Sequence, residues 1–147
     1  MNVPRSVLAV ALGGALGSLA RYAAGGAAEA MGAESWWATF VVNVVGCLLM
    51  GLLVAAVLDR PERSRSLVWR PFLAVGVLGG FTTFSAFAGD AVQLVESGAA
   101  IASAAYIVGT LVITLAALRL GLALGRDRRG RPGRPAGPTP DREGRTP

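Results

Sequence analysis

The residues with the clearest chemical potential form one short run inside an apolar stretch: Gly79-Gly80-Phe81-Thr82-Thr83-Phe84-Ser85-Ala86-Phe87. Two adjacent glycines are expected to interrupt a helix here, and hydrocarbon offers no water to the backbone groups that an interruption frees. Protein, a water-filled cavity or an ion must therefore meet those groups. This requirement predicts an ion pathway.

The run offers donors for ions of either sign. Released carbonyl oxygens near Gly79 are hard donors suited to Na⁺. Phe84 and Phe87 lie on one helical face, and an anion would approach the positive edge of their rings. Thr83 and Ser85 add hydroxyl groups. For each residue alone, the alternative is ordinary packing or a hydroxyl bonded to the carbonyl four residues back. The run as a unit favours function, because polar groups in mid-span are usually functional.

Further polar residues lie in the other apolar stretches. Asn43 must find hydrogen-bond partners within its span, either by bridging helices or by serving a pathway. Thr39 lies four residues earlier and therefore on the same face. Tyr106 and Thr110 also share a face and would extend a polar track, provided that the glycine-aromatic run is functional.

Arg21 is a charged residue about 15 positions into the first stretch, or about 22 Å along a helix. A charge at that depth usually faces a wet cavity or a partner. Arg21 could draw anions into a vestibule. Alternatively, it snorkels to the far interface or pairs with Asp90 or a glutamate.

Four apolar stretches must position these residues, in a chain with 53% hydrophobic residues and a mean hydropathy of +0.54. About 20 helical residues cross about 30 Å of hydrocarbon. The expected spans are Ser6–Ala28, Trp37–Leu58, Phe72–Val95 and Ala99–Leu124. They predict an all-α membrane protein with four transmembrane helices, the third broken at mid-membrane near Gly79. Residues 1–124 form this domain, and the Gly-, Pro- and Arg-rich residues 125–147 predict a disordered tail.

The charge pattern orients the chain in the membrane. All 14 basic residues are arginines, and there is no histidine. Apart from Arg21 and Arg119, which lie within spans, they precede the first span, occupy the loop after the second and fill the tail, whereas the opposite loops carry glutamates and no arginine. The positive-inside rule therefore predicts cytoplasmic termini and explains the basic pI without nucleic acid. The single Cys47 excludes a disulfide framework.

The sequence is similar to the Fluc (CrcB) family of small fluoride channels. The resemblance covers the chain from about Gly13 to Gly125. It rests on three motifs in the same order on successive helices: Gly13-Gly14-Ala15-Leu16-Gly17-Ser18-Leu19-Ala20-Arg21-Tyr22, Thr39-Phe40-Val41-Val42-Asn43-Val44-Val45-Gly46-Cys47 and Gly79-Gly80-Phe81-Thr82-Thr83-Phe84-Ser85.

The resemblance implies a fluoride-selective channel of the cytoplasmic membrane that exports fluoride passively and so reduces its toxicity. It implies an antiparallel dimer with two pores and a central structural Na⁺ that is not transported. The carbonyls of Gly79 and Thr82 would hold this Na⁺, and Arg21 would line the vestibule. The fluoride pore would use Asn43, Thr83, Phe84, Ser85, Phe87, Tyr106 and Thr110.

The chain departs from the family pattern at a few positions. Ala86 stands where threonine is usual, Asp90 replaces a glutamate and Thr110 replaces a serine. The implied partners are fluoride, membrane lipid and a second subunit. The strong arginine bias leads to the hypothesis that this subunit is an oppositely oriented paralogue, with a second copy of the chain as the alternative.

Three other classes of protein compete with a channel. A proton-coupled small multidrug exporter needs an ionisable acid within a span, a role that only Asp90 approaches. A purely structural membrane protein would need no ion site. An intramembrane enzyme would need a nucleophile and a base, and no such set can be drawn, so the chain is predicted not to be an enzyme.

Overall fold

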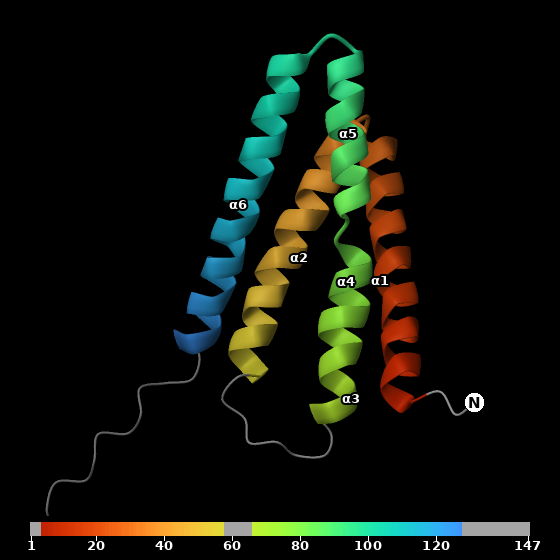
Figure 1. The fold of residues 1–147 in the computed structure, drawn as a ribbon, viewed down its shortest axis with the longest axis vertical. Helices are drawn as coiled ribbons and strands as arrows, with labels where there is room; N and C mark the ends of the chain where they lie inside the picture. The colour runs from red at the N-terminus through yellow and green to blue at the C-terminus, as the bar shows by residue number, and fades with distance from the viewer. Residues whose placement is uncertain (1–3, 58–65, 128–147) are drawn as a thin grey trace, which may run out of the picture.

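The computed structural model describes residues 4–57 and 66–127 and shows an all-helical arrangement of long, roughly aligned segments (Figure 1). Four of the described helices are long and apolar enough to cross a membrane, which confirms the four predicted spans. The elements are α1 (Arg5–Ala30), α2 (Ser35–Val57), α3 (Ser66–Arg70), η1 (Pro71–Leu78), α4 (Gly79–Phe81), α5 (Phe84–Glu96) and α6 (Ala100–Asp127).

The third span is assembled from the consecutive elements α3 to α5, so that one apolar stretch extends over Val68–Glu96. Most of the arginine-rich loop after α2 and most of the predicted tail lie outside the described residues. The predictions of tail disorder and of a cytoplasmic arginine loop therefore stay predictions.

The helices pack mainly in two pairs. α2 lies along α6, and α1 lies along η1 and α4 (Figure 1). A short turn joins α5 to α6, and Gly98 occupies its left-handed position with φ +83°. Glycine adopts this conformation without steric cost, which allows the tight antiparallel connection at this point.

Glycines lie where the paired helices cross most closely. A Cβ atom on Gly17 would meet the carbonyl oxygen of Val77, and one on Gly80 would meet that of Gly14. On the other pair, a Cβ on Gly51 would meet the carbonyl oxygen of Leu118. Glycine at these positions therefore lets the two backbones approach to a distance that a side chain would prevent.

The third span departs from regular α-helix at two places. η1 is an eight-residue π-helix that begins at Pro71. Further on, Thr82 (φ −75°, ψ 156°) and Thr83 (φ −148°, ψ 128°) have extended backbone between α4 and α5. Figure 1 shows this non-helical link.

The expectation that the glycine pair itself interrupts the helix is wrong. Gly79 has helical dihedral angles (φ −67°, ψ −34°) and begins α4. Gly80 is helical too, and it lies against the backbone of Gly14. The pair serves helix packing, and the backbone leaves the helix at Thr82, three residues after Gly79.

Candidate ion-binding cavity

Asn43 on α2 holds the extended backbone of Thr83 by two hydrogen bonds. The Thr83 N–H donates to Asn43 Oδ1 at 2.9 Å, and Asn43 Nδ2 donates to the Thr83 carbonyl at 3.0 Å. A peptide that has left its helix needs such partners where water is excluded. The structure thus shows Asn43 as a bridge between helices. Its expected contact with an ion stays a prediction, and one Nδ2 hydrogen is left over for it.

The threonine hydroxyls have local partners. Thr82 donates both its N–H (3.0 Å) and its hydroxyl (2.9 Å) to the carbonyl of Leu78, which is the back-bonding alternative for this residue. Thr83 Oγ1 accepts the N–H of Ala86 at 3.2 Å and so caps the start of α5. The exposed hydroxyl of Ser85 lies 3.2 Å from Thr83 Oγ1.

These contacts divert the usual donors from two carbonyl groups. In an α-helix the Gly79 carbonyl would accept the N–H of Thr83, which instead donates to Asn43. The Thr82 carbonyl would accept the N–H of Ala86, which instead donates to Thr83 Oγ1. Both oxygens therefore lack their helical partner.

A cavity of about 370 Å³ lies beside this link. Seven predicted site residues line it: Asn43, Gly79, Thr82, Thr83, Phe84, Phe87 and Thr110. Residues from three spans thus meet at one place. The sequence reading missed Cys47 and Thr114, which also line the cavity. Each follows a predicted residue by four positions, so helical periodicity could have found both.

The two phenylalanines have different surroundings. Phe84 is 77% exposed within the chain, whereas Phe87 is 8% exposed. Their ring centroids are 5.7 Å apart, and Phe87 also lies 5.3 Å from the ring of Tyr106. Phe87 therefore belongs to the packed core, and Phe84 presents a ring that its own chain leaves uncovered.

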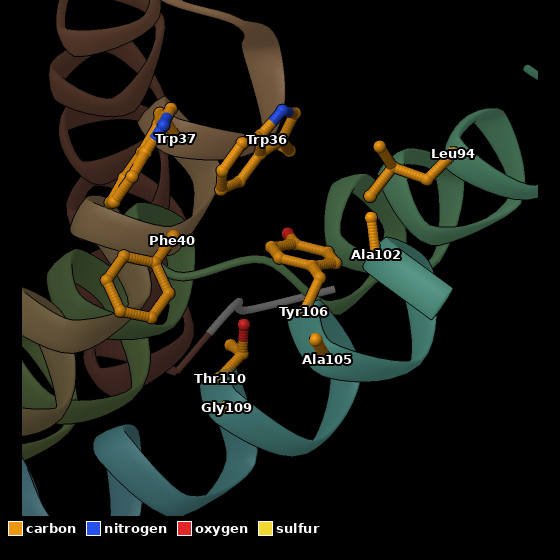
Figure 2. A pocket seen from close by; sticks show the side chains of 9 residues that line it. All are labelled: Trp36, Trp37, Phe40, Leu94, Ala102, Ala105, Tyr106, Gly109 and Thr110. Carbon is orange, nitrogen blue, oxygen red and sulfur yellow. The ribbon is translucent and has the colours of Figure 1, made fainter. Parts of the chain in front are cut away.

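Tyr106 and Thr110 project from α6 into a second pocket of about 340 Å³, opposite Trp36, Trp37 and Phe40 of α2 (Figure 2). Thr110 also lines the first cavity. It is 4% exposed, and its hydroxyl oxygen has no hydrogen-bond partner among the described residues. A buried polar atom of this kind is rare and calls for a guest such as water or an ion.

Asp90 on α5 is a buried acidic residue. Its carboxylate accepts hydrogen bonds from the Ser35 hydroxyl at 2.9 Å and from the Tyr106 hydroxyl at 3.4 Å. These bonds tie the start of α2 to α5 and α6. They also occupy both carboxylate oxygens.

Arg21 lines a third cavity of about 360 Å³, together with Thr39, Thr83 and Ala86. Within residues 4–57 and 66–127 no ion pair joins Arg21 to a carboxylate, and Asp90 is bonded elsewhere. The alternative that Arg21 pairs with Asp90 is therefore wrong. Its vestibule role stays a prediction, as does snorkelling.

The third cavity leads toward an acidic end. A larger space of about 740 Å³ shares Gly25, Ala38, Thr39 and Ala86 with it and is lined by Glu29, Glu34 and Asp90. Thr83 lines both the third cavity and the first. The hollows thus form a series from one end of the molecule to the non-helical link.

The fold and these cavities define a multi-pass helical membrane protein with a polar site at the point where one span leaves the helix. A family described as CrcB-like protein, Camphor Resistance (CrcB), matches residues 8–122. The chain belongs to this family.

Three curated relatives are similar over most of their length. The Agrobacterium fabrum protein named "Fluoride-specific ion channel FluC" is 48% identical over 123 residues, which cover 83% of this chain and 97% of the relative. The Paracoccus denitrificans protein of the same name is 46% identical, covering 81% and 93%. "Fluoride-specific ion channel FluC 2" of Nocardia farcinica is 42% identical, covering 84% and 86%. These names denote channels, and the prediction of a non-enzyme is confirmed.

Proposed function

We propose that this protein is a fluoride-selective channel that lets fluoride leave the cytoplasm passively across the cytoplasmic membrane. The observation that carries the proposal is the cavity in which Asn43, Thr110 and Phe84 meet beside two carbonyls without helical partners. The names of the relatives support the choice of fluoride. Passive export lowers the internal fluoride concentration and hence its toxicity.

Neutral donors suit a small, strongly hydrated anion. The pathway must replace the water around fluoride and still bind it weakly enough for exit. The free Nδ2 hydrogen of Asn43, the unpartnered hydroxyl of Thr110 and the ring edge of Phe84 are uncharged donors. None of them would hold the anion as a fixed cation in the pore would. Arg21, which lines the third cavity, would attract fluoride into the pathway.

A structural Na⁺ fits the two diverted carbonyls. Gly79 and Thr82 both line the cavity, and carbonyl oxygens are the hard ligands that hard cations prefer. When bound, Na⁺ would stabilise the extended backbone between α4 and α5. Two carbonyls are fewer oxygen ligands than a cation of this kind takes.

A second subunit would complete this site. The ring of Phe84 is 77% exposed, as expected for a surface that another chain covers. An antiparallel pair related by a two-fold axis in the membrane plane would bring both non-helical links to one level and surround a central ion with four carbonyls. The partner is either a second copy or an oppositely oriented paralogue.

Fluoride efflux from liposomes tests the proposal. The purified protein should pass fluoride and exclude chloride, and replacement of Na⁺ by a large organic cation during preparation should reduce the flux. Phe84→Ile should abolish fluoride flux. Phe72→Ile is the control, because Phe72 packs against Trp69, away from the cavity. Equal fluoride and chloride flux, or full flux in Phe84→Ile, would contradict the proposal.

A further inference from the structure

Cys47 is a free thiol that the proposed function does not use. It is half-buried on α2, one helical turn after Asn43, and it lines the cavity beside Thr82 and Thr110. The neighbouring Gly46 lies against the side chain of Thr82, so α2 meets the non-helical link at this level. The thiol is therefore placed where added atoms would enter the cavity.

A second observation indicates that small polar molecules reach this space. Thr110 lines the same cavity, and its buried hydroxyl has no partner in the described part of the chain. A buried hydroxyl without a hydrogen bond is unfavourable, which favours a small polar guest there. A cavity of about 370 Å³ has room for such a guest and for a compact reagent.

We infer that Cys47 is a site of covalent modification by small thiol-directed electrophiles, and that its modification closes the cavity to ions. The closing effect rests on the proposed function. With methyl methanethiosulfonate, the Cys47 sulfur attacks the methylthio sulfur and forms a disulfide bond. The bond between that sulfur and the sulfonyl sulfur breaks, methanesulfinate leaves with the electron pair, and the thiol proton goes to solvent. The side chain gains one methylthio group.

The experiment uses the full chain in liposomes and two measurements. Intact-mass spectrometry reports how much Cys47 carries the methylthio group, and the fluoride electrode reports flux from the same sample. Treatment should add one group and reduce fluoride flux at least tenfold, and dithiothreitol should restore both values. Cys47→Ser and Cys47→Ala should pass fluoride untreated and should ignore the reagent.

A control thiol outside the cavity separates blocking from general damage. Ser97→Cys in the Cys47→Ser background places a thiol in the exposed turn after α5. It should be labelled without loss of flux. A labelled Cys47 with normal flux, or a Cys47 that takes no label, would overturn the inference. Absence of flux in the untreated protein would contradict the proposed function instead.

Discussion

Asn43 illustrates how one side chain can be structural and still stand at a functional site. Its amide uses one donor and one acceptor on the backbone of Thr83. Sequence reasoning left open whether Asn43 bridges helices or serves a pathway. The geometry shows the bridge, and because the bridge frees the Gly79 carbonyl, it also prepares the proposed cation site.

Asn43→Ala should destabilise the protein strongly. The change leaves the Thr83 N–H and carbonyl without partners, at a cost of about 1–3 kcal/mol for each unsatisfied group. Thermal unfolding in detergent measures the loss. Ser18→Ala is the matched control, because the exposed Ser18 hydroxyl lies 3.5 Å from the Gly80 carbonyl and contributes little. Equal melting temperatures for the two variants would contradict the role of Asn43.

Thr110→Val should separate stability from transport. Its hydroxyl has no protein partner, so an isosteric apolar replacement should leave the melting temperature equal or higher. Fluoride flux should fall, because the pathway loses a donor. Thr114→Val should lower the melting temperature slightly, since that hydroxyl donates to the Thr110 carbonyl at 2.7 Å. A destabilised Thr110→Val would show that the hydroxyl has a structural partner.

At the scale of the elements, hydrophobic length carried most of the prediction. It defined the four spans, whereas the pairing of the helices is known only from the structure. The position of the non-helical link was wrong, because two glycines in sequence do not reveal that a neighbouring helix holds them in helical form. The backbone of Gly14 packs against Gly80, and the hydrogen bonds of Asn43 decide where helical bonding ends.

Gly17→Ala should disrupt the pairing of α1 with the third span. The new methyl group would collide with the carbonyl oxygen of Val77, a rigid backbone atom. Overpacking of this kind costs about 1–3 kcal/mol or more. Gly14→Ala is the control on the same helix, because a Cβ there meets nothing within 4 Å. Thermal unfolding should show a large loss for Gly17→Ala only, and similar losses in both would refute the packing argument.

At the scale of the whole molecule, the cavity depends on residues distant in sequence, and periodicity alone could not show which of them meet. The family resemblance assigned Tyr106, Ser85 and Thr110 alike to the fluoride pore. The structure places Tyr106 against Asp90 and Phe87, and Ser85 on an exposed face. Only the packing of α2 against α6 selects Thr110 and Thr114 for the cavity.

The arginine bias should set the orientation of the whole chain. Replacing Arg60, Arg63 and Arg65 with glutamine should increase the share of copies that insert the other way, because these residues flank two spans. A reporter fused to the C-terminus measures that share. Asp59→Asn with Glu62→Gln in the same loop should have little effect, since acidic residues contribute little to topology. An unchanged orientation in the triple variant would contradict the prediction that the arginine bias orients the chain.

The π-helix before Gly79 has a consequence for how this sequence tolerates change in length. Between Pro71 and Leu78 each backbone hydrogen bond joins residues five apart, whereas in an α-helix it joins residues four apart. The segment therefore holds one residue more than an α-helix of the same number of turns. Removal of Ala74 should let the segment rewind as regular helix and absorb the loss within that turn. Deletion of Ala91 from the regular helix α5 would instead rotate everything that follows it. The yield of folded protein should be higher after deletion of Ala74 than after deletion of Ala91. Equal yields would show that the π-helix does not accommodate the loss of a residue.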